Sequence, residues 1–105
     1  MTNPPTLTSP KHFLSASNLS REAINAIIDR AIEIKRLGLE TQPLIGESAA
    51  LIFEKPSLRT RVSFEAGLHR LGAHPIELNL SGSRIGERES IPDLAAYLSR
   101  AVSLI

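Results

Sequence analysis

SAALIFEKPSLRTRVSFE, residues 48–65, joins an apolar run to a helical pattern through a short polar turn. Its first part, SAALIF, is typical of a short strand buried on both faces of a sheet. Helical spacing follows from about Leu58 to Leu71, and Gly72 is a natural stop. One face of this helix is predicted to carry Phe64, Gly67, Leu68 and Leu71, with Gly67 permitting close packing.

The N-terminal part predicts a loose lead-in followed by a helix. Residues 1–10 are rich in Pro and Thr and are expected to form a flexible lead-in to a domain of residues 11–105. Within that domain Ser20 is a candidate N-cap. Isoleucines at helical spacing continue to about Leu37, where Gly38 is suited to end the helix.

The C-terminal part repeats the alternation of strand and helix. Residues 74–80, HPIELNL, predict a second strand. A capping box of Ser90 and Asp93 predicts a third helix to about Arg100. Residues 101–105 begin like a third strand.

The order strand, helix, strand, helix, strand predicts an α/β fold. We expect a parallel sheet with flanking helices, doubly wound and in three layers. On the third helix, Leu94, Tyr97 and Leu98 are predicted to face the core. Three strands make a thin sheet, and the third starts where the sequence ends. We therefore expect a truncated part of a larger fold.

The composition is that of an ordinary globular protein. Of the 105 residues, 42% are hydrophobic and 22% are charged, and the net charge is +1, which gives no basic field for nucleic acid. The absence of cysteine excludes disulfides and thiolate metal sites and fits a reducing cytoplasm. Apolar runs of about five residues are far below the ~20 residues of a membrane span. We expect a soluble, cytoplasmic protein without nucleic-acid or membrane partners.

Polar side chains follow both predicted strands of the sheet. Because the carboxyl ends of parallel strands meet at one edge, the turn after residue 53 and the loop 81–90 are expected to lie together. They carry hydroxyls and cations without cysteine or clustered histidine, so phosphate recognition suits them and no metal site is predicted. The residues are Ser57, Arg59, Thr60, Ser81, Ser83, Arg84 and Arg88.

Arg59 raises an electrostatic question, because the start of a helix carries partial positive charge. Arg61 can pair with Glu65 four residues later, although Arg before Glu is the weaker order. Arg59 has no acid three or four residues onward. An exogenous anion would supply its partner. Solvation or a pair with Glu54 would serve equally well on spacing alone.

The sequence resembles a known family at several blocks. FEKPSLRTRVSFE is similar to the carbamoyl-phosphate signature of the aspartate/ornithine carbamoyltransferases, whose core reads Ser-Thr-Arg-Thr-Arg. KHFLSASNLS and GSRIGERESIPDLAAYLSR look like flanking segments of the ornithine branch, and LHRLGAH fits the family's helix end. The blocks run in family order from Lys11 to Ile105.

The resemblance implies a site and a reaction. Ser57, the backbone of Leu58, Arg59 and Thr60 would bind the phosphate of carbamoyl phosphate, with Arg59 as the catalytic residue. The δ-amino group of ornithine would attack the carbamoyl carbon, giving citrulline and phosphate in arginine biosynthesis without cofactor or metal. The family is built as a catalytic trimer, so a homo-oligomer is expected.

Two positions depart from the family pattern. Leu58 stands where threonine is usual, which keeps the N–H and loses one hydroxyl donor. Arg84 occupies the position where the family usually has a glutamine or histidine that touches the phosphate. The resemblance therefore implies that Arg84 contacts the phosphate of carbamoyl phosphate, and its alternative role is that of a plain loop arginine. The form Ser-Leu-Arg-Thr-Arg also resembles the transcarbamylases that use N-acylated ornithine.

Alternatives to an ornithine enzyme remain open. Aspartate, putrescine or an N-acylornithine could be the acceptor, or the chain could bind phosphate without catalysis. Three parts of the family's site find no match in the sequence. They are a further arginine that contacts the carbamoyl group, a histidine that polarises the carbonyl, and the domain that binds the second substrate. The resemblance therefore implies that these 105 residues alone are inactive.

Overall fold

The computed structural model describes residues 12–39, 41–78 and 89–105. The chain divides into two compact units, Met1–Leu39 and Glu40–Ile105. The lead-in predicted for residues 1–10 lies outside the described residues.

The first unit contains a short 3-10 helix, η1 (Ala16–Asn18), and the helix α1 (Arg21–Leu37). Ser20 caps α1 as predicted, accepting a hydrogen bond from the Ala23 amide at 3.1 Å. Gly38 ends the helix at a φ of 87°. η1 was not predicted, and it is held by a capping box between Ser15 and Asn18, whose side chains compete with a longer helix.

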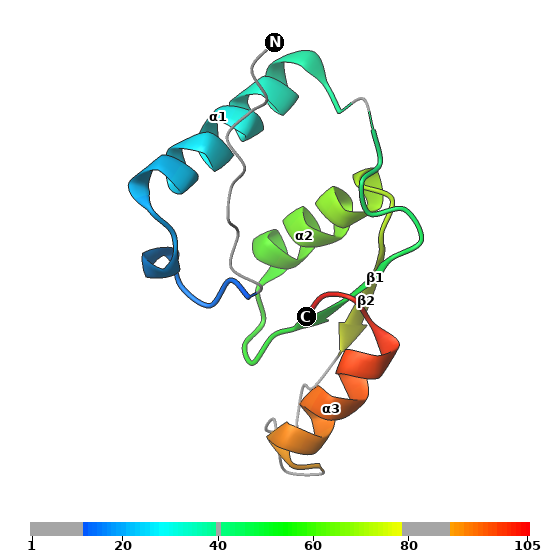
Figure 1. Cartoon of the computed structure of the whole chain (residues 1–105). Helices are drawn as coiled ribbons and strands as arrows, with labels where there is room; N and C mark the ends of the chain where they lie inside the picture. The colour runs from blue at the N-terminus through cyan, green and yellow to red at the C-terminus, as the bar shows by residue number, and fades with distance from the viewer. Residues whose placement is uncertain (1–11, 40, 79–88) are drawn as a thin grey trace. The chain divides into compact units, whose positions relative to one another are not determined.

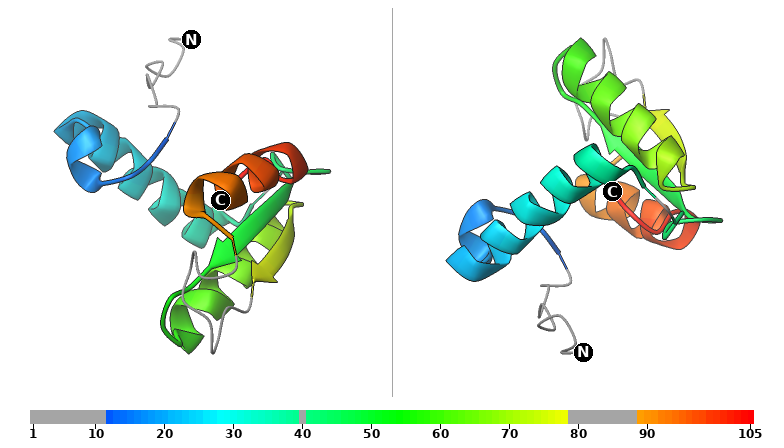
Figure 2. Two further views of the ribbon diagram at one scale, coloured as in Figure 1. Left: turned by 90° about the horizontal axis from the view of Figure 1, so that it is seen from below. Right: turned by 90° about the horizontal axis from the view of Figure 1, so that it is seen from above.

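The second unit contains the sheet. Strands β1 (Ser48–Ile52) and β2 (His74–Leu78) pair in parallel, and the helix α2 (Leu58–Arg70) connects them. The helix α3 (Ile91–Ala101) follows, and in all views the two strands run between α2 and α3 (Figures 1 and 2). The predicted α/β arrangement, a parallel sheet with flanking helices, is confirmed.

Among the described residues the expected third strand is reduced to a single β-bridge with three backbone hydrogen bonds to β1. Leu104 forms a parallel bridge with Ala49, and the Ala50 amide donates to the Leu104 carbonyl at 2.9 Å. β1 therefore lies between β2 and Leu104. Ala101, which was predicted to start the strand, is the last residue of α3.

The core of the second unit is small and centred on β1. Ala49, Leu68 and Ala73 are buried together, with Leu44 and Leu51 packed against them. Ala50, the next residue of β1, is also buried. Adjacent strand residues point to opposite faces, so the middle of β1 is buried on both faces as predicted.

Several predicted packing roles are wrong. Tyr97 on α3 was predicted to face the core but is 65% exposed. Leu98 is the one residue of α3 that is buried. Phe64 is also exposed on α2, whose buried residue is Leu68. Gly67 does not serve close packing, since a Cβ added there would meet no atom within 4 Å.

Gly72 is needed where α2 turns into β2. The Ala73 amide donates to the Leu68 carbonyl at 2.9 Å and the Gly72 amide to the His69 carbonyl at 3.0 Å, the pattern of a Schellman helix end. Gly72 has a φ of +93°, and a Cβ there would lie 3.0 Å from the Ile45 Cα. Only glycine fits both the angle and the neighbouring backbone.

We expect Gly72→Ala to lower the free energy of unfolding by about 1–3 kcal/mol, because it combines a positive φ with a backbone clash. Gly67→Ala is the matched control, since open space surrounds Gly67 in the same helix. It should raise stability by about 0.5–1 kcal/mol. Urea unfolding of both variants measures the difference, and equal effects would contradict the assignment.

Candidate functional site

The turn between β1 and α2 ends at Ser57, the N-cap of α2. Its backbone angles are φ −145° and ψ 78°, and its side chain makes no capping hydrogen bond. By contrast, Ser20 caps α1, and Ser90 caps α3 by accepting from the Asp93 amide at 3.2 Å. The hydroxyl of Ser57 is therefore not used to cap its helix.

The amides at the start of α2 are available as donors. A helix leaves its first N–H groups without internal partners. Within the described residues, no hydrogen bond is found from the amides of Leu58, Arg59 and Thr60. The first backbone bond of this turn runs from the Arg61 amide to the Ser57 carbonyl, at 2.9 Å. Three amides and one hydroxyl thus meet at the turn.

The charge at this helix start is inverted relative to the other two helices. α1 has Glu22 and α3 has Asp93 in the first turn, whereas α2 has no acidic residue there. Arg59 is exposed and has no ion-pair partner in the described part of the chain, so the alternative pair with Glu54 is not observed. The positive end of the helix dipole thus coincides with a guanidinium that no described acid neutralises.

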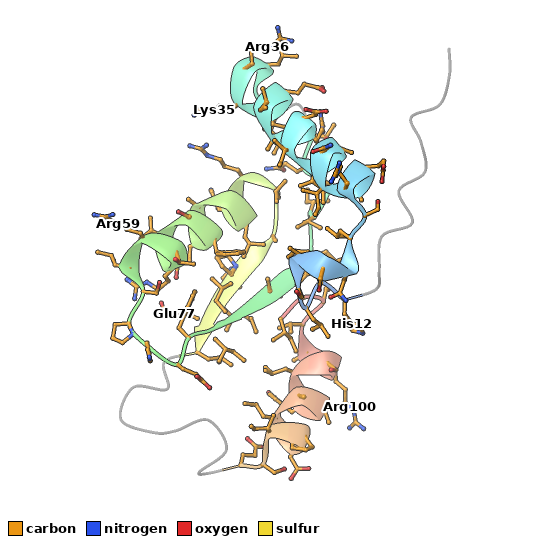
Figure 3. All side chains as sticks on the ribbon, turned by 90° about the vertical axis from the view of Figure 1, so that its left-hand side faces the viewer. His12, Lys35, Arg36, Arg59, Glu77 and Arg100 are labelled. Carbon is orange, nitrogen blue, oxygen red and sulfur yellow. The ribbon has the colours of Figure 1, made fainter. Side chains whose placement is uncertain are left out.

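The predicted pair between Arg61 and Glu65 is wrong. Arg61 Nη1 instead donates to Glu77 Oε1 of β2 at 3.1 Å. α2 packs against β2, which brings Glu77 within reach of a residue in the first turn. Figure 3 shows Arg59 directed away from the strands and Glu77 on the strand beside the helix.

Sequence reasoning missed Glu77, although strand alternation carried a signal. Glu77 is in register with Leu51, which packs with the core on the α2 side of the sheet. Register neighbours point to the same face. An acidic residue on a helix-covered face needs a partner, and a cation near the start of α2 is suited to supply it.

The second half of the predicted edge is not described. β1 and β2 end level with each other, since Ile52 is in register with Leu78. Arg84, with the loop from residue 81 to 88, lies outside the described residues, so its place at the site stays a prediction. No group of His, Cys, Asp or Glu suited to a metal occurs among the described residues.

A site of amides, a hydroxyl and a guanidinium suits an anion with several oxygens. Helix-start amides bind phosphate oxygens through directed N–H groups. A guanidinium adds charge and two donors that match a pair of oxygens.

Within the same described ranges, no helix is long and apolar enough to cross a membrane.

The free hydroxyl of Ser57 has a measurable consequence for stability. Ser90→Ala removes a cap and should cost about 1 kcal/mol of unfolding free energy. Ser57→Ala removes no hydrogen bond found among the described residues and should change the unfolding free energy by less than about 0.5 kcal/mol. Thermal or urea unfolding compares the two variants, and an equal loss for Ser57→Ala would show that its hydroxyl supports the fold.

Comparison with known proteins identifies relatives of this turn and its sheet. Residues 11–105 match the domain described as "Aspartate/ornithine carbamoyltransferase, carbamoyl-P binding domain". The ornithine carbamoyltransferase of Cupriavidus metallidurans is 45% identical over 101 residues, which cover 93% of this chain and 33% of that protein. The chain thus spans about a third of the length of this curated relative.

Solved structures agree with the sequence match. Ornithine carbamoyltransferase from Thermus thermophilus has a TM-score of 0.81 and 40% identity, covering 90% of this chain and 33% of that chain. The catalytic subunit of aspartate transcarbamoylase from M. jannaschii has a TM-score of 0.76 and 31% identity, covering 90% and 33%. Together with the match over residues 11–105, these findings confirm the resemblance seen in the motifs: the chain belongs to the aspartate/ornithine carbamoyltransferase family, as a counterpart of its carbamoyl-phosphate-binding domain.

Proposed function

We propose that this chain binds carbamoyl phosphate as part of an ornithine carbamoyltransferase. The reaction transfers the carbamoyl group to the δ-amino group of ornithine and yields citrulline and phosphate, a step of arginine biosynthesis. The observation that carries the proposal is the start of α2 in a member of this family. There a serine hydroxyl that does not cap the helix, three amides and Arg59 occur together, and Arg59 has no ion-pair partner among the described residues.

Each residue of the turn has a distinct role in this proposal. The Ser57 hydroxyl, the amides of Leu58 and Arg59, and Thr60 bind the phosphate oxygens. Arg59 carries the charge that neutralises the phosphate as it leaves. Arg84, from the second loop, adds a further cation to the same oxygens. All five residues belong to this proposal.

Catalysis then depends on positioning and electrostatics. The amine attacks the carbamoyl carbon, and negative charge develops on the carbonyl oxygen and on the departing phosphate. A guanidinium fixed in place before the reaction stabilises this charge without reorganisation. Binding both substrates in one site converts the encounter into a reaction between oriented groups. No metal or cofactor enters this scheme.

The acceptor and the assembly are the finer parts of the proposal. The blocks that resemble the ornithine branch favour ornithine, and the 45% identity to an ornithine enzyme supports the same choice. An N-acylornithine is the second candidate acceptor, because the form with Leu58 also resembles the transcarbamylases that use N-acylated ornithine. Aspartate, putrescine and phosphate binding without catalysis are further alternatives. We include in the proposal a cytoplasmic homotrimer or multiple of trimers, with residues 11–105 as the carbamoyl-phosphate domain.

Arg59→Ala tests the binding role. Calorimetric titration of carbamoyl phosphate is carried out on the unchanged protein and on the variant, both at the length that the gene encodes. The Kd of the variant should be weaker by about tenfold or more, because a charge-assisted pair is lost. Arg70→Ala is the matched control, since Arg70 is exposed at the other end of the same helix. An unchanged Kd for Arg59→Ala would refute the site.

A citrulline assay of the same proteins tests the reaction. The protein should form citrulline from ornithine and carbamoyl phosphate, and Arg59→Ala should lower kcat by about 10²–10³. Formation of product from N-acetylornithine, aspartate or putrescine instead would reassign the acceptor. Binding of carbamoyl phosphate without turnover of any of these amines would leave a phosphate-binding protein.

A further inference from the structure

Arg61 joins the first turn of α2 to the sheet through two bonds. Its amide donates to the Ser57 carbonyl at 2.9 Å and closes the first turn. Its Nη1 donates to Glu77 Oε1 on β2 at 3.1 Å. The same residue therefore shapes the turn with its backbone and attaches the turn to β2 with its side chain.

The pair is partly withdrawn from water. The Arg61 and Glu77 side chains are 39% and 34% exposed. Arg61 Nε is buried and has no hydrogen-bond partner in the described part of the chain. A buried donor without a partner costs free energy. Among the described residues, Glu77 is the acid that pairs with this guanidinium. Removing one member of a partly buried pair is costlier than removing an exposed one.

The attachment also holds one side of the first turn of α2 toward β2. Residues two apart on a helix do not face the same side. With the Arg61 side chain held toward β2, Arg59 is turned away from the strands, as Figure 3 shows. If Arg61 were released, no ion pair within the described residues would fix which way the first turn presents Arg59.

We infer that Arg61 is a positioning residue and that Glu77 anchors it, so that the pair holds the Ser57 hydroxyl and Arg59 in the orientation that binds phosphate. This inference rests on the proposed function, because it concerns the geometry of the same site. In this inference Arg61 acts through the turn and not by contact with the anion, because its Nη1 is engaged by Glu77.

The test is a double-mutant cycle on the Kd for carbamoyl phosphate, and for inorganic phosphate as a second probe. Arg61→Gln and Glu77→Gln should each weaken both Kd values by about fivefold. The double variant should be within about twofold of the weaker single variant, because both changes break one interaction. Arg61→Lys keeps the charge and should recover most of the affinity.

These readouts separate positioning from a structural role. A pair that only stabilises the fold would lower the melting temperature and the fraction of binding-competent protein while leaving the Kd of that fraction unchanged. Glu33→Gln is the control, because Glu33 forms an exposed pair with Arg30 on α1 at 2.8 Å, and it should not change the Kd. Unchanged or tightened Kd values for Glu77→Gln, or independent effects in the double variant, would overturn the inference.

Arg59→Ala distinguishes this failure from failure of the proposed function. If Arg59→Ala leaves the Kd unchanged, the anion site itself is wrong. If it weakens the Kd while Glu77→Gln and Arg61→Gln do not, the site stands and the positioning role falls.

Discussion

The parallel pairing of β1 with β2 is the constraint on which the second unit depends. Parallel strands cannot be joined by a tight turn, so the chain must cross over, and α2 is that crossover. The start of α2 therefore falls at the edge of the sheet where β1 ends. Gly72 then returns the chain to the start of β2 through a positive φ. The location of the candidate anion-binding turn follows from the direction of the strands.

The electrostatics of the helix starts separate structural from functional charge. α1 and α3 each follow the rule that stabilises a helix, with a serine cap and an acid in the first turn. α2 breaks both parts of the rule: its N-cap serine makes no capping hydrogen bond, and its first turn carries two arginines in place of an acid. One of the two, Arg61, is neutralised within the protein by Glu77. Arg59 has no ion-pair partner among the described residues, so a bound anion would supply the counter-charge that this part of the fold does not provide.

What the sequence could predict follows from the range of the interactions involved. The α1 cap at Ser20 and the strand of residues 48–52 depend on neighbours within a few residues. A serine before a helical pattern and a continuous apolar run were enough to predict them. The partner of Arg61 depends on the packing of α2 against β2, so a pair four residues apart was chosen in place of Glu77. The exposure of Tyr97 is likewise set by tertiary packing. Hydrophobic spacing predicts which side of a helix is apolar, but it does not predict how much of that side the neighbouring elements bury.

The departure at Leu58 shows how little of this turn depends on side chains. The Leu58 side chain is 67% exposed, so core packing does not account for the leucine. Its amide is fixed by the start of α2 and remains a donor whatever side chain the residue carries. Arg59 is the opposite case, because its contribution is a delocalised charge with paired donors that no backbone group supplies. Under the proposed function, a turn built in this way would tolerate exchange of threonine for leucine at position 58, while its affinity for a doubly charged anion would depend on the arginine that follows.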